Sequence, residues 1–285
     1  MKSPILHTVA VLAAVLVHSP AASGEEPQKN VSAESALYDI HSGKPLVVHV
    51  TVPLCSNTQI DCGSAVAGDP DRLETNLYWG AAFGHRRFFD RKKSGFSRVE
   101  LSAGKGAVLE RAIYRRNISA LPFGGDADET VELLVVLEAY HGESIDKAVL
   151  DFYERATHGG TVRFQDGDTL REERISIAGY AGHNRLMDGL TFPKAAADEK
   201  RGHAIPSFAL ACYSESYMGP SLREAGSKTL LMTRALMAPE GYVLDAVVSA
   251  VGENAAPAGI RERAVGAYAK WQKLSNGAAG SIFQK

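Results

Sequence analysis

The chain has little net charge, few cysteines and, beyond its first residues, no long apolar run. Its 31 Lys and Arg residues stand against 33 Asp and Glu residues, and the resulting net charge of −2 gives no electrostatic footprint for nucleic acid or an anionic membrane. Three cysteines in 285 residues exclude a disulfide-stapled scaffold. Hydrophobic and charged shares of 45% and 22% are those of a globular domain, which excludes disordered, collagenous and coiled-coil chains.

Residues 1–24 have the pattern of a secretory signal peptide. Lys2 supplies the positive start, residues 5–17 are apolar apart from two positions, and the small residues of 21–24 suit a cleavage site. A transmembrane anchor is the alternative, but it needs about 20 continuous apolar residues and this run is shorter. The sequence therefore predicts an exported protein, periplasmic or extracellular, with no membrane contact after the signal is removed.

The remaining chain divides into a polar leader over residues 25–44, a single α/β domain over 45–275 and a C-terminal tail over 276–285. Short β-branched runs alternate with amphipathic segments through the domain, which favours a mostly parallel sheet flanked by helices. Strands are expected at 45–52, 108–114, 130–139, 174–180, 207–212 and 229–233, and helices at 74–90, 144–157, 239–251 and 258–274. No pattern in the sequence indicates an oligomeric state.

Two of the expected strands run into residues that can carry chemistry. The first is followed by Gly182 and His183, and the second ends at Cys212. In an open parallel sheet, ligands bind outside the carboxyl ends of the strands, so neighbouring strands would bring these residues to one edge. An imidazole beside a thiol can take its proton, and the thiolate can attack a carbonyl carbon. Gly182 would let a substrate carbonyl approach backbone N–H groups that stabilise an oxyanion.

The order of a strand followed by His183, then a strand followed by Ala211-Cys212, resembles the caspase, legumain and gingipain group (clan CD) of cysteine peptidases. The resemblance implies a three-layer, caspase-like αβα sandwich, with Cys212 as nucleophile, His183 as base and a peptide or protein substrate. The sequence departs from that group at Asn184, where glycine is usual, and has no Gln-Ala-Cys-Arg-Gly. Segments 76–80 and 237–240 also resemble those of uncharacterised bacterial exported proteins.

Alternatives to this interpretation remain open at the level of sequence. His141-Gly142 follows the strongest predicted strand and is a second candidate for the base, although another helix and strand separate it from Cys212. A cysteine at a strand end is commonly a small buried apolar residue, so the competing hypothesis is a non-catalytic exported binding or scaffold module. A reactive thiol would distinguish the hydrolase from the module.

The remaining sequence signals concern disulfides, metals and cofactors. Cys55 and Cys62 lie close together in a loop-like stretch, and export favours a local disulfide between them, which leaves Cys212 as the free thiol. The chain has no Cys-x-x-Cys or His-Glu-x-x-His spacing and no phosphate-binding loop, so we expect neither a metal nor a cofactor.

Overall fold

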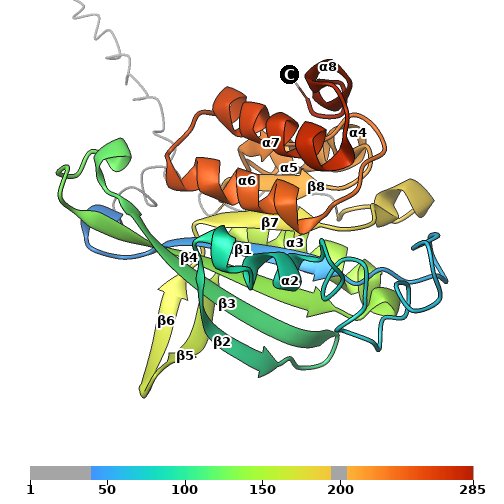
Figure 1. Cartoon of the computed structure of the whole chain (residues 1–285), viewed down its shortest axis with the longest axis horizontal. Coiled ribbons are helices and arrows are strands. Elements are labelled where there is room, and N and C mark those ends of the chain that lie inside the picture. Colours follow the sequence, from blue (N-terminus) through green and yellow to red (C-terminus); the bar gives the residue numbers. More distant parts are fainter. Residues whose placement is uncertain (1–39, 194–203, 285) are drawn as a thin grey trace, which may run out of the picture.

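The computed structural model describes residues 40–193 and 204–284, and its centre is a seven-stranded sheet with the order β2-β3-β4-β1-β7-β8-β9 (Figure 1). The run from β4 to β9 is parallel, whereas β2 and β3 pair antiparallel at one edge. The predicted mixed α/β fold with a mostly parallel sheet is therefore confirmed. The predicted signal peptide at 1–24 lies outside the described residues.

Along the described residues, single strands and runs of strands are separated by helices. The strands are β1 (Leu46–Pro53), β2 (Ser97–Ala103), β3 (Val108–Ser119), β4 (Thr130–Tyr140), β5 (Thr161–Asp166), β6 (Thr169–Arg174), β7 (Ile177–Ala181), β8 (Ser207–Leu210) and β9 (Thr229–Leu231). The helices are α2 (His85–Phe89), α3 (Ile145–His158), α4 (Ser214–Tyr217), α5 (Gly219–Glu224), α6 (Gly241–Gly252), α7 (Pro257–Gln272) and α8 (Asn276–Gly280). All eight residues of β1 are buried, as expected for a central strand of a parallel sheet covered on both faces.

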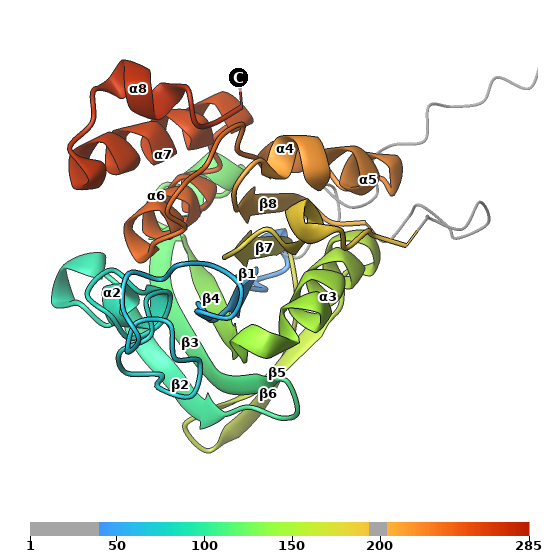
Figure 2. The same ribbon diagram turned by 90° about the vertical axis from the view of Figure 1, so that its right-hand side faces the viewer.

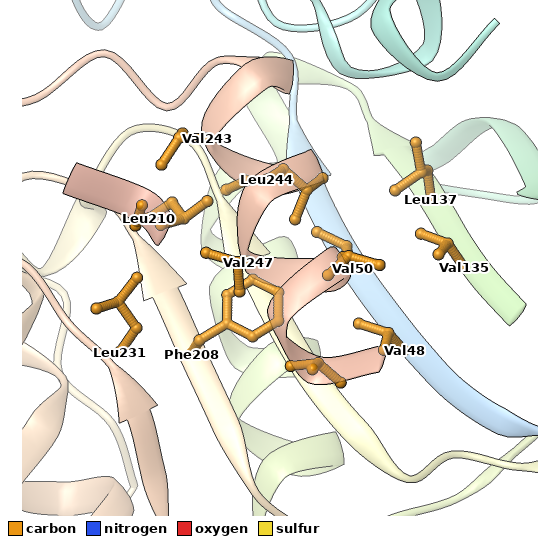
Figure 3. Packing of buried hydrophobic residues seen from close by; sticks show 14 of the residues in the cluster. Val48, Val50, Val135, Leu137, Phe208, Leu210, Leu231, Val243, Leu244 and Val247 are labelled. Carbon is orange, nitrogen blue, oxygen red and sulfur yellow. The ribbon is translucent and has the colours of Figure 1, made fainter. Parts of the chain in front are cut away.

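One face of the parallel strands is covered by α6 and α7. Figure 3 shows Leu244 of α6 beside Val50 of β1 and Val247 of α6 beside Phe208 of β8, and these side chains belong to one buried apolar cluster. The helix is apolar on most of its circumference, because it packs on the sheet on one side and on α7 on the other.

The opposite face is covered in two different ways. Over β7 and β8, Phe152 of α3, Tyr180 of β7 and Leu222 of α5 join a second apolar cluster, and Figure 2 shows α3 on the far side of these strands from α6 and α7. Over β3 and β4, a hairpin of β5 and β6 takes the place of a helix, with Val162 and Phe164 packed on the strands. Helices therefore flank the parallel strands, while the antiparallel edge has a strand layer.

The helix expected at 74–90 is mostly absent, because its first part folds as turns and only α2 is helical. Asn76 is fully buried, and its side chain bonds both the N–H and the carbonyl of Cys55, at 3.1 and 2.8 Å. Gly80 and Gly84 approach other backbone so closely that a Cβ would lie 2.3 and 2.4 Å from it. The apolar spacing that indicated a helix instead places Tyr78 and Trp79 in the core.

The cysteine pairing and the lengths of the helices bear on the prediction that the protein is exported. The predicted disulfide is confirmed, with Cys55 and Cys62 joined at 2.00 Å, and a disulfide fits an oxidising compartment. None of the helices in the described ranges is long and apolar enough to cross a membrane.

The segment expected as a C-terminal tail is folded. It contains α8, and Phe283 is fully buried and forms a β-bridge with Thr233 beside β9.

Candidate functional site

His183 and Cys212 lie at the carboxyl ends of two neighbouring parallel strands. β7 and β8 are paired through Ala181 and Leu210, and the Gly182 N–H extends the pairing by donating to the Leu210 carbonyl at 3.1 Å. His183 follows Gly182 after β7, and Cys212 lies two residues beyond Leu210, the last residue of β8. The structure therefore brings the two predicted segments together at one edge of the sheet.

Asn184 ties these two loops to each other. Its fully buried side chain donates from Nδ2 to the Cys212 carbonyl at 2.6 Å and accepts the Leu186 N–H at 3.2 Å. The Tyr180 hydroxyl adds a second constraint by donating to the His183 carbonyl at 2.6 Å. In the sequence, Asn184 stands out only as a departure from glycine, although an asparagine before a short helical turn is a recognised capping signal.

Replacing Asn184 by alanine is expected to lower the free energy of unfolding by about 2 kcal/mol, because it leaves a buried carbonyl without its donor. Urea denaturation measures the loss. The matched control is Asn117→Ala, since Asn117 is exposed on β3. Equal stability of the two variants would contradict a linking role for Asn184.

The His183 ring is held by a carboxylate. Its Nε2 lies 2.6 Å from Asp188 Oδ2, with the histidine side chain 12% exposed and the aspartate 43% exposed. Arg185, in the same loop, pairs with Asp146 of α3 at 2.8 Å. An imidazole oriented through one nitrogen presents the other, here Nδ1, for proton transfer. Asp188 is not among the site residues expected from the sequence.

The Cys212 thiol is half-buried and contacts backbone, not a histidine. Its sulfur accepts the Met237 N–H at 3.4 Å and lies 3.6 Å from the Met237 carbonyl, to which the thiol can donate. Within the described ranges, no hydrogen bond joins this thiol to His183 or His141. Met237 is 25 residues away in sequence, and no local pattern could have identified the contact.

Two tyrosines complete the surroundings of the thiol. Burial raises the pKa of Tyr78 well above its usual range, and the neighbouring Cys212 and Glu240 add to the shift. Burial likewise raises the pKa of Tyr268, whose hydroxyl accepts the Ala238 N–H at 2.9 Å. Both phenols therefore stay protonated and can donate hydrogen bonds.

The residue after Cys212 has a strained backbone. Tyr213 has φ 50° and ψ 30°, the left-handed region that a bulky side chain rarely adopts. This conformation turns the chain sharply from the end of β8 into α4, where its N–H donates to Ala235 at 3.1 Å. Strain of this kind persists where the surrounding structure enforces it, and it is enriched at functional sites.

Gly182 contributes close packing. A Cβ at this position would lie 2.5 Å from Pro53 Cγ at the end of β1, so a larger residue would separate β7 from β1. Its N–H is already bonded to Leu210, whereas the backbone N–H groups of Cys212 and His183 have no backbone acceptor in the part of the chain described. The Gly182 N–H, which the sequence placed near an oxyanion, is therefore used within the sheet.

His141 lies elsewhere along the same edge. It follows β4, which is separated from β8 by β1 and β7, and three strand spacings amount to roughly 14 Å. Its ring contacts Asp71 at 3.3 Å and accepts the Glu143 N–H at 3.2 Å. The sheet order therefore favours His183 over His141 as a partner for Cys212.

A second polar cluster, centred on Glu138, is buried between the sheet and α3. Its carboxylate Oε2 lies 3.2 Å from His49 Nε2 and 2.9 Å from Arg155 Nη2. Burial lowers the pKa of His49, with Arg155 adding to the effect, so this histidine is neutral. Burial alone would raise the pKa of Glu138, but the hydrogen bond from His49 and the positive charge of Arg155 outweigh it and lower the value to about 2. The charged pair in this cluster is thus Glu138 with Arg155.

The described residues contain no group of three or more His, Cys, Asp or Glu side chains that could hold a metal ion. Comparison of the chain with protein-family models, with curated proteins and with solved structures gives no match. What defines the site is therefore its own geometry: a free thiol and a carboxylate-bound imidazole at adjacent strand ends of a mostly parallel α/β sheet.

Proposed function

We propose that this protein is an exported cysteine hydrolase with a caspase-like three-layer sandwich, acting on peptide or amide bonds. The observation that carries the proposal is the position of Cys212 and His183 at the carboxyl ends of the paired strands β7 and β8, tied together by Asn184. This edge of a parallel sheet is where ligand sites form. Peptides or proteins would be the substrates.

In the proposed reaction, His183 takes the thiol proton at its free Nδ1, and the Cys212 sulfur attacks the substrate carbonyl carbon. The C=O electron pair moves to oxygen, which the Cys212 N–H can stabilise. Collapse of this intermediate breaks the C–N bond, and His183 returns the proton to the leaving amine. Water then cleaves the thioester, which releases the acid and restores the thiol.

The reaction requires the imidazole to reach the sulfur. Asp188 holds Nε2, and Met237 holds the thiol, so a ring rotation or a shift of the loop must bring them together. Catalytic hydrogen bonds are often long in enzymes without substrate and tighten in the complex. The second candidate function is a non-catalytic binding module. It is favoured by the fact that His183 bonds to Asp188 and Cys212 to Met237, and not to each other.

The test is cleavage of a diverse peptide mixture, followed by mass spectrometry of new termini between pH 5 and 8. The protein should generate new termini at a measurable rate, and Cys212→Ala should generate none, because no other free thiol is present among the three cysteines, all of which are described. Identical cleavage by the variant, or no cleavage by either protein, would favour the binding module.

A further inference from the structure

A cavity lies at the opposite end of the sheet from Cys212. It has a volume of about 360 Å³ and is bounded by the amino ends of β1, β7 and β9 and by the turn between α6 and α7. Ligand pockets in proteins run from about 300 to 1,000 Å³, so the volume is sufficient for a small molecule. The cavity shares no residue with the site around Cys212.

The walls of the cavity are mainly apolar. Leu46, Ile177, Leu230 and Ile260 line it, and they retain exposed fractions of 4, 8, 8 and 2%, whereas Val48 on the same strand as Leu46 is fully buried. These four side chains are therefore buried apolar residues that border the cavity. Such a surface favours an apolar ligand body, because filling it removes apolar area from water.

A cation, Lys228, lies at this apolar cavity. Lys228 is exposed at the amino end of β9 and forms no ion pair with any residue in the described ranges. The other polar lining groups are already engaged: the Ser176 hydroxyl accepts the Val47 N–H, and the Asn254 side chain donates to a backbone carbonyl. Among the residues that the structure describes, none of the cavity's lining side chains is acidic, so its electrostatic preference is for an anion.

We propose that this cavity binds a small amphipathic monocarboxylate, with its apolar body between the strand ends and α7 and its carboxylate on Lys228. At about 30 Å³ per water-sized group, the volume holds roughly twelve non-hydrogen atoms. A saturated acid of ten carbons has that size. The proposal is independent of the hydrolase proposal, because the two sites lie at opposite ends of the sheet.

Titration of the exported chain with decanoate, followed by calorimetry, tests the proposal. Decanol has the same apolar body without the charge, and it is expected to bind about five- to tenfold more weakly. Lys228→Gln should remove that difference while leaving decanol binding unchanged, and Arg223→Gln, a charge removal on α5 outside the cavity, should leave both affinities as they were. Raising the salt concentration should weaken decanoate binding only.

A blocking variant keeps the test independent of charge. Ala255 lines the cavity and is half-buried at the edge of the main apolar cluster, so a phenylalanine there should fill the cavity, and Ala255→Phe should abolish binding of both ligands. Equal affinity for decanoate and decanol, or binding that survives Ala255→Phe, would overturn the proposal. Absence of binding together with self-association that Ala255→Phe prevents would instead identify the cavity as a contact between copies of the chain.

Discussion

Glu138→Gln is expected to lower the free energy of unfolding at pH 7 by about 3 kcal/mol. The substitution keeps the shape of the side chain but removes the carboxylate that contacts both His49 and Arg155. Removing one partner of a buried ion pair leaves an uncompensated charge, which costs about 3 to 5 kcal/mol. The lower end applies here because Arg155 remains 22% exposed.

The effect depends on pH in a defined direction. The pKa of Glu138 falls from its ordinary 4.5 to about 2 in the folded protein, so its contribution to stability is full above pH 4.5 and disappears as the pH approaches 2. Urea denaturation at pH 7 and at pH 3 should therefore show a smaller difference between Glu138→Gln and the unmodified protein at the lower pH.

A matched substitution separates this effect from a general loss of charge. Glu172→Gln removes a carboxylate from an exposed pair with Arg163 in the hairpin of β5 and β6, and it should leave the unfolding midpoint unchanged. If Glu138→Gln and Glu172→Gln were equally stable at pH 7, the buried cluster would make no net contribution.

His183→Ala is expected to slow alkylation of Cys212 by tenfold or more near pH 7. The thiolate is the reactive form of cysteine, and an unassisted thiol is only a few per cent ionised at this pH. A histidine that accepts the thiol proton raises that fraction. Iodoacetamide labelling measured by intact mass reports on Cys212 alone, because Cys55 and Cys62 are disulfide-bonded.

His141→Ala provides the control for this measurement. His141 is also at the end of a strand and also contacts an aspartate, but β1 and β7 separate its strand from β8. Its replacement should leave the labelling rate unchanged. A slow rate that neither substitution alters would indicate that the thiol and the imidazole do not interact, as the binding module requires.

Local sequence signals predicted the elements that are buried and regular. The β-branched runs of β1 and β4 and the apolar stripe of α3 appear close to the expected residues, because full burial demands continuous or periodic apolar side chains. The strands β2 and β6 were not predicted, because their residues are largely exposed and charged and lack such an apolar pattern. Segment 74–84 was wrongly predicted as a helix. Its apolar residues are spaced as in a helix, but the segment folds as turns that the Asn76 side chain fixes through its bonds to Cys55.

The candidate site was predictable only in part. Cys212 and His183 could be named from their positions after apolar runs, and the adjacency of β7 and β8 followed the general tendency of consecutive strands to pair. The contacts of Asn184 with the Cys212 carbonyl and of Met237 with the thiol could not be anticipated. They join residues 28 and 25 positions apart, and their geometry depends on how the loops pack.

By itself, the sequence determined the class of fold, the local disulfide and the identity of the unpaired cysteine, since periodicity and cysteine spacing are properties of short segments. Tertiary structure alone decided the order of the strands, and with it the distance of His141 from Cys212. It also decided that His183 meets Asp188 and that an apolar cavity opens beside Lys228. Those features come from contacts between segments remote in the chain, whose packing no local pattern encodes.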